Sequence, residues 1–145
     1  MIPKFIDEDY QPNYNIEIVE APSYTHKMHI DEERVYGHIE DEVEAVKQMI
    51  YKCINTEKDI FPIYRQFGVK KRDLFGKRKG YAFAVLTLRI EDALMLDDRI
   101  KSVTNFVYHP EWSDEDNLGM SFTVKTIFED KEIPIKEVMD LGQRI

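Results

Sequence analysis

Cysteine is nearly absent from this sequence, because Cys53 is the only one in 145 residues. A single thiol cannot form a disulfide within the chain, and it cannot supply the set of thiolates that holds a structural zinc ion. The chain also lacks any apolar run near the roughly 20 residues that a membrane-spanning helix needs. Its N-terminus lacks the basic-then-apolar order of a signal peptide. We therefore expect synthesis in the cytoplasm and no membrane partner.

Recognisable catalytic motifs are missing as well. No serine lies in a Gly-x-Ser-x-Gly turn, and no glycine-rich phosphate loop is present. His26, His29 and His38 fall in one predicted hairpin, but residues 26 and 29 point to opposite faces of a regular strand. Acidic pairs are abundant, and in an acidic chain most carboxylates are solvated or ion-paired. We predict that the protein is not an enzyme and needs no metal or cofactor, with a small hydrolase as the third-ranked alternative.

Charge is unevenly distributed along the chain. The sequence has 28 acidic and 20 basic residues, and its formal net charge of −8 opposes general binding to nucleic acid. A basic run between residues 70 and 79 has three interpretations: a solvated loop, a nucleic-acid contact, or a patch for an acidic protein partner. This basic run comprises Lys70, Lys71, Arg72, Lys77, Arg78 and Lys79.

Proline marks the N-terminal region. Residues 1–24 contain three of the six prolines. Because proline resists helix and removes ladder donors, we predict an extended N-terminal arm there, with one short strand over residues 16–20. Residues 25–145 are predicted to form a single domain, since a chain of this length can bury one core.

Hydrophobic periodicity predicts the elements of that domain. A hairpin is expected over residues 25–39. Asp41 is expected to cap a helix that ends at Asn55, and a second helix is expected over residues 81–96. The remaining expected elements are strands over 100–108, 120–128 and 133–138, with a turn at 129–131. The predicted fold class is α+β, with two principal helices on a mainly antiparallel sheet.

Two further features point to partner contacts. Pro134 cannot donate a ladder hydrogen bond, so the last strand is predicted at a sheet edge. The residues expected to meet a partner strand there are Ile133, Pro134, Ile135 and Lys136. A second proline, at Ile135, is expected to block this pairing and leave the helices intact. Trp112 lies in a polar loop, where it either packs on its own fold or acts as an interface anchor.

Short stretches spread over residues 25–138 resemble one known family in their order and spacing. They are EAVKQMIYK at 44–52, NTE at 55–57, PIY at 62–64, FG at 67–68, DLFG at 73–76, LMLDDRI at 94–100, VT at 103–104 and FTVKTIF at 122–128. In this order they resemble the baseplate wedge or sheath-initiator family of contractile tails. The branch is that of Gram-positive phages, defective prophages and contractile bacteriocins, which is related to baseplate proteins of type VI secretion.

The resemblance implies a structural role. Members of this family sit at the top of the baseplate around the inner tube and offer sheet edges to the first ring of sheath subunits. The implied partners are sheath subunits, tube or hub proteins and baseplate wedge proteins, with several copies in a ring-like assembly. Synthesis in the bacterial cytoplasm would then be followed by assembly into a phage tail or another contractile particle. A nucleic-acid-binding accessory protein that uses the basic run is the alternative.

Arg99 is the residue that carries over most directly from the family. Relatives often have Glu-Pro-Arg where this chain reads Asp97-Asp98-Arg99. We expect Arg99 to be structural, because a partly buried guanidinium ties carboxylates and carbonyls together, and its expected ion-pair partners are Glu57 and Asp97.

Overall fold

The structure, a computed structural model, describes residues 24–128 and 132–142. Within these residues five strands form two antiparallel sheets, accompanied by two α-helices of 13 and 16 residues. The predicted α+β class is confirmed. The predicted N-terminal arm, with its strand over residues 16–20, lies outside the described residues except for Tyr24, and so does the predicted turn at 129–131.

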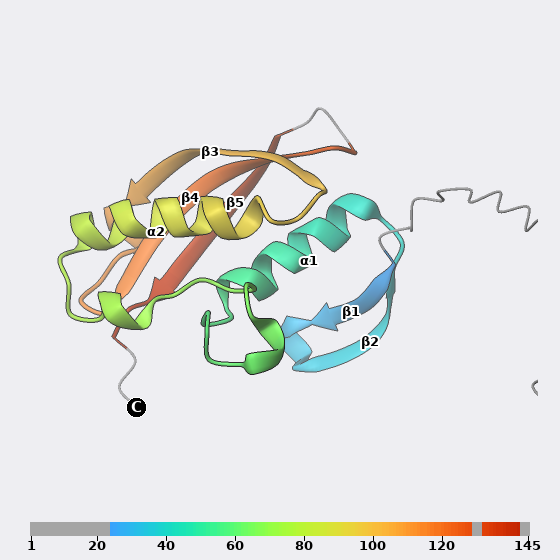
Figure 1. The fold of residues 1–145 in the computed structure, drawn as a ribbon, viewed down its shortest axis with the longest axis horizontal. Helices are drawn as coiled ribbons and strands as arrows, with labels where there is room; N and C mark the ends of the chain where they lie inside the picture. Colours follow the sequence, from blue (N-terminus) through green and yellow to red (C-terminus); the bar gives the residue numbers. More distant parts are fainter. Residues whose placement is uncertain (1–23, 129–131, 143–145) are drawn as a thin grey trace, which may run out of the picture.

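The first half of the described chain is a hairpin followed by a helix. Strands β1 (Thr25–His29) and β2 (Arg34–Ile39) pair antiparallel as a separate two-stranded sheet. A short 3-10 helix, η1 (Ile30–Glu32), joins them. Helix α1 (Glu42–Ile54) follows and lies between this hairpin and the rest of the molecule (Figure 1).

The second half builds the larger sheet. An irregular segment with the 3-10 helices η2 (Pro62–Tyr64) and η3 (Arg72–Leu74) leads to α2 (Lys79–Leu94). The remaining elements are β3 (Ile100–His109), the 3-10 helix η4 (Pro110–Trp112), β4 (Asn117–Thr126) and β5 (Glu132–Asp140). The three strands lie in the order β3-β4-β5, so β4 is central and the other two strands are edges.

Helix α1 begins and ends where the sequence predicts. The Asp41 carboxylate accepts hydrogen bonds from the backbone N–H groups of Val43 and Glu44 at 2.8 and 3.1 Å. Such a cap stabilises a helix by about 1 kcal/mol. Asn55 ends the helix, and its side-chain amide donates to the Tyr51 carbonyl at 2.9 Å. The buried face carries Ala45, Val46, Ile50, Cys53 and Ile54.

Helix α2 begins and ends two residues before the predicted span of 81–96. Apolar spacing in the sequence continues to Leu96, but Asp97 turns the chain into β3. Its carboxylate accepts a hydrogen bond from the Arg99 N–H at 2.9 Å, and its carbonyl accepts one from the Ile100 N–H at 3.1 Å. A side chain that competes for backbone donors in this way ends a helix before its hydrophobic pattern stops.

The three-stranded sheet has one buried face, across which α2 lies (Figure 1), and buried residues of α1 join the same core. Alternate residues of β4 point into this core, namely Leu118, Met120, Phe122 and Val124. The Phe122 ring stacks on Phe106 of β3 with centroids 5.3 Å apart. The opposite face, called the outer face below, carries the half-buried polar residues Ser121, Thr123 and Lys125 of the same strand.

The hairpin is tied to α1 through one glutamine. The Gln48 side chain accepts a hydrogen bond from the Met28 N–H and donates one to the His26 carbonyl, both at 2.8 Å. These two bonds occupy backbone groups of β1 as a neighbouring strand would. Within the hairpin the His26 ring lies tilted against His38, whereas the His29 ring stacks on Tyr36.

Candidate functional site

The β5 edge of the larger sheet is regular along its whole length. Nine consecutive pairs join β5 to β4, from Asn117 with Asp140 to Lys125 with Glu132, and no register shift interrupts them. A strand in such a register presents its other side as a straight row of backbone groups. The last strand thus lies at a sheet edge, as Pro134 predicts.

One hydrogen bond determines which backbone groups of β5 face outward. The Leu141 N–H donates to the Asp116 carbonyl at 2.7 Å, in the same register as the β4–β5 pairs. Because backbone groups alternate in direction along a strand, the N–H groups of residues 133, 135, 137 and 139 also point to β4. The outward N–H groups belong to Glu132, Lys136, Val138 and Asp140, while Pro134 offers only its carbonyl.

The β3 edge of the same sheet is irregular. Register shifts occur between Ile100 and Ser102 and between Thr104 and Val107. Inside the second shift Asn105 has a positive φ of 56°, a left-handed conformation that asparagine tolerates better than most residues. A bulge of this kind bends the strand and interrupts its row of donors and acceptors. Of the two edges, β5 is therefore the better template for another strand.

Trp112 packs on its own sheet. Its ring stacks on His109 with centroids 4.0 Å apart, and the Lys136 ammonium of β5 lies 5.6 Å from its centroid. Gly119 of β4 leaves room for it, since a Cβ atom there would lie 2.5 Å from the Trp112 Cβ. The half-buried indole covers part of the outer face beside β5, so Trp112 packs on its own fold, the first of its two interpretations. The second, a role as an interface anchor, stays a prediction.

A Ser–His–Glu array that the sequence did not suggest lies beneath this tryptophan. His109 Nε2 is 2.7 Å from Ser121 Oγ, and His109 Nδ1 is 2.9 Å from Glu111 Oε1. This is the order of a nucleophile, base and acid. However, Ser121 lies on the central strand β4, whose backbone N–H groups pair with β3 on one side and β5 on the other, so the amides around Ser121 are not free to form an oxyanion hole. Through His109, these hydrogen bonds connect Glu111 of η4 to Ser121 of β4 and hold η4 against the outer face.

Two of the six cations of the basic run have partners within the molecule. The Lys71 ammonium is half-buried and donates to the Ile54 carbonyl at 2.7 Å, and the Lys79 ammonium donates to the Glu115 carbonyl at 3.0 Å. Burial lowers the pKa of Lys71, and nearby carboxylates offset part of that effect. The other four cations, Lys70, Arg72, Lys77 and Arg78, are exposed. The use of the four exposed cations for a partner stays a prediction.

Of the two partners predicted for Arg99, Asp97 forms an ion pair with it and Glu57 does not. Arg99 binds Asp97 at two points, with Nε to Oδ1 at 2.9 Å and Nη2 to Oδ2 at 2.7 Å. The hydrogen bonds from Arg99 hold the pKa of the Asp97 carboxyl below its usual range. Glu57 is engaged elsewhere, because its carboxylate accepts hydrogen bonds from the backbone N–H groups of Lys71 and Arg72 at 2.9 to 3.1 Å. Glu57 therefore orders the start of η3.

The described residues contain no group of three or more His, Cys, Asp or Glu side chains placed to hold a metal ion. None of the helices among these residues is long and apolar enough to cross a membrane. Cys53 is buried, and burial raises the pKa of its thiol.

Comparison with known sequences decides the family of this chain. The family described as contractile injection system sheath initiator matches residues 23–129. The chain belongs to the sheath initiators of contractile injection systems. This sheath initiator is also 28% identical over 127 residues to the phage-like element PBSX protein XkdS of Bacillus subtilis (strain 168), covering 85% of this chain and 86% of that protein.

Family membership confirms the resemblance read from the short stretches and gives the chain a structural role in a contractile tail. Sheath initiators interact with sheath and tail-assembly components, and they assemble into a tail particle. The sheath-initiator family is a structural one.

Proposed function

We propose that this sheath initiator starts sheath polymerisation by adding a strand of a sheath subunit to the β5 edge. Several copies would stand in a ring around the tube at the baseplate, in contact with tube or hub and wedge proteins. The observation that carries the proposal is the uninterrupted β5 register, with outward N–H groups at Glu132, Lys136, Val138 and Asp140. Sheet edges of this kind bind extended segments by β-augmentation.

The energetics of such a contact suit a connection between subunits that must resist a pulling force. Each backbone hydrogen bond contributes a net of about 1 kcal/mol, so a row of them along β5 adds up to several kcal/mol. The bonds lie side by side and share a pulling force. Because backbone bonds carry no sequence information, the side chains that alternate along the added strand must set the register.

Pro134 limits this edge to a chosen partner. It removes one outward donor near the start of β5, and the outer-face residues Lys136 and Glu132 add charge beside it. Proline and charge are the devices by which natural edges resist random pairing. A partner strand that places no carbonyl acceptor opposite Pro134 would pair with β5 without leaving a hydrogen bond unmade.

The test replaces one outward donor. In Lys136→Pro the missing N–H faces away from β4, so the sheet keeps its internal ladder while the edge loses a second donor. We expect this variant to fold and to fail in nucleating sheath on tubes, as measured by the fraction of tubes that carry sheath. Lys136→Ala is the matched control, because it loses the same ammonium and keeps the N–H. Normal nucleation by the folded Lys136→Pro variant would place the contact elsewhere.

A proline at Ile135, expected to block strand addition and leave the helices intact, would not test the edge alone. The Ile135 N–H points to β4, in the pair with Phe122. Proline there would remove a bond inside the sheet, so a failure of Ile135→Pro to nucleate would not distinguish a lost edge from a damaged domain.

A further inference from the structure

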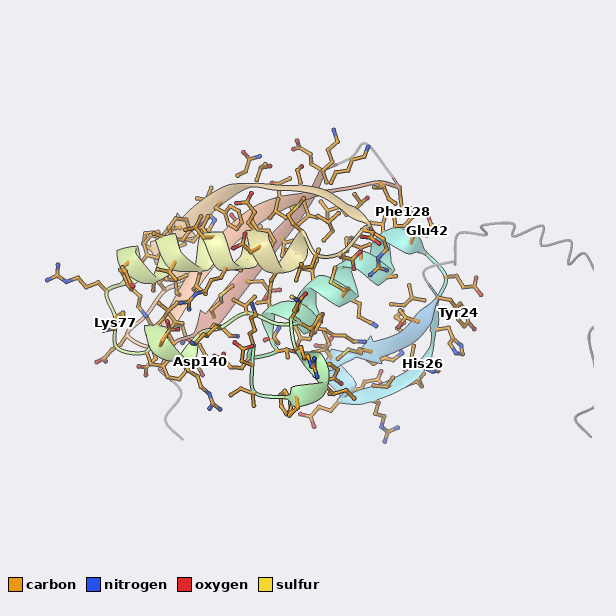
Figure 2. All side chains as sticks on the ribbon, viewed as in Figure 1. Tyr24, His26, Glu42, Lys77, Phe128 and Asp140 are labelled. Atoms are coloured by element: carbon orange, nitrogen blue, oxygen red, sulfur yellow. The ribbon has the colours of Figure 1, made fainter. Side chains whose placement is uncertain are left out.

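A cavity of about 320 Å³ opens beside the C-terminal end of β5. Its apolar lining includes Phe75 and Val138, and its polar lining includes Glu57, Lys71 and Arg72. Asp140, at the same end of the strand, lies toward the end of the molecule opposite Tyr24 and His26 of the hairpin (Figure 2). None of the hairpin residues described lines this cavity.

The polar groups of the cavity are not equally free to bind. The Glu57 carboxylate already accepts backbone hydrogen bonds from Lys71 and Arg72, and the Lys71 ammonium donates to the Ile54 carbonyl. The Asp140 carboxylate accepts a hydrogen bond from the Gly142 N–H at 2.9 Å. Arg72 is exposed, and its backbone N–H rather than its guanidinium makes the bond to Glu57. Of the two cationic groups that line this cavity, the Arg72 guanidinium is therefore the one available to bind a ligand.

The geometry of β5 connects the cavity to an added strand. Met139 points to the helix side of the sheet and lines the cavity together with its neighbours Val138 and Asp140. In an antiparallel or parallel pair, a residue opposite Met139 points to the same side of the sheet. One side chain of a strand added to β5 would therefore enter this cavity.

We propose that this cavity, lined by Arg72 and Lys71 beside the last residues of β5, receives an acidic side chain of the added sheath strand. This inference rests on the strand-addition function proposed above and names the residue that sets its register. A carboxylate matches the planar, two-point donor geometry of the Arg72 guanidinium.

The first test compares two arginines of the basic run in the full-length chain. Arg72→Glu and Arg78→Glu make the same charge change, but Arg72 lines the cavity, whereas Arg78 is an exposed residue just before α2. The probe is the purified sheath subunit of the same contractile particle. We expect Arg72→Glu to weaken its binding by about tenfold or more, which is the range of a charged hydrogen bond, and Arg78→Glu to change it less than twofold.

A reciprocal experiment identifies the acidic residue. Each Asp and Glu in the terminal strands of the sheath subunit is changed to Lys in turn. We expect one such variant to bind the native initiator about tenfold more weakly and to regain binding with Arg72→Glu. If no variant regains binding, the acidic-residue inference is overturned. Tighter binding after removal of residues 143–145 would also overturn it, since the C-terminal residues would then be the occupant.

The two proposals fail in different ways. If Lys136→Pro blocks nucleation while Arg72→Glu behaves like Arg78→Glu, strand addition stands and the acidic anchor is wrong. If the folded Lys136→Pro variant nucleates normally, strand addition at β5 is wrong, whatever the arginine variants do.

Discussion

The two edges of the three-stranded sheet are built in opposite ways. Along β5, nine consecutive residues pair with β4 in one register, whereas along β3 two register shifts break the ladder. Both strands use the same central strand and lie beneath the same helical layer. The difference shows that one sheet can close one edge against pairing and keep the other available.

The small hairpin sheet shows a third arrangement, in which a side chain binds backbone groups at a strand edge. On β1 the Gln48 side chain occupies the Met28 N–H and the His26 carbonyl, so a side chain takes the place of a strand. In the part of the chain that the structure describes, β5 thus keeps the longest regular row of outward backbone groups. An assembly protein with one available edge can add strands in one direction without aggregating through the others.

The largest expected effect comes from the strand that both edges share. Phe122 is fully buried and stacks on Phe106 of β3. We expect Phe122→Ala to lower the free energy of unfolding by about 3–5 kcal/mol, because it leaves a cavity between the sheet and the helices. Urea denaturation followed by the fluorescence of the single tryptophan would measure this loss.

Thr123→Ala is the control for that variant. Thr123 follows Phe122 on β4 but faces the outer side of the sheet, where it is half-buried. Its loss is expected to cost no more than about 1 kcal/mol. Equal losses at the two positions would contradict the assignment of the helix-covered face as the core.

A middle-sized effect is expected at the start of β3. Arg99→Ala removes the two-point ion pair with Asp97. The Asp97 side chain is 18% exposed and the Arg99 side chain is 26% exposed. Solvent weakens such a pair, so we expect a loss of about 1–2 kcal/mol at neutral pH. Thermal unfolding of both proteins would measure it, and an unchanged melting temperature would contradict a structural role.

The pH dependence of the same variant provides an independent check. The pKa of Asp97 is lower in the folded protein than its ordinary value of 3.8, chiefly because the Arg99 side chain donates hydrogen bonds to it. A lowered folded pKa gives stability that is present above the ordinary pKa and is lost as the pH falls through the folded value. The difference between native protein and Arg99→Ala should therefore shrink below pH 3.8. A difference that stays constant into strong acid would argue against the ion pair.

The smallest expected effect concerns the bulge that closes β3. At Asn105, with φ of 56°, an alanine is expected to cost about 1 kcal/mol, and a glycine is expected to be nearly neutral. Neither change should alter sheath nucleation, because the β3 edge is not the one proposed for strand addition. A nucleation defect in the stable Asn105→Gly variant would show that β3 takes part.

Features that depend on neighbouring residues were predictable. The Asp41 cap and the apolar spacing after it predict α1, since a helix is determined by local donors and by one hydrophobic face. Pro134 places the last strand at an edge because a missing N–H is a property of one residue. The α+β class follows from the same local patterns, and the ordered short stretches pointed to the family.

Features that depend on segments meeting in space were decided by the tertiary structure. Glu57 binds the backbone of Lys71 and Arg72 rather than Arg99 because the irregular segment after α1 folds back on itself. The basic run looks continuous in the sequence, but its members turn to different neighbours. The Ser121–His109–Glu111 array exists only because β4 pairs with β3, and a strand register is not written in either strand alone.

The same division applies to the candidate site. The sequence by itself determined that a proline-bearing strand ends the sheet and that it belongs to a sheath initiator. The direction of each N–H along β5, and the cavity that places Arg72 beside that strand, were decided only by tertiary packing. The physical reason is range: a capping group or a missing donor acts over a few residues, whereas an interaction edge is defined by what does and does not pack against it.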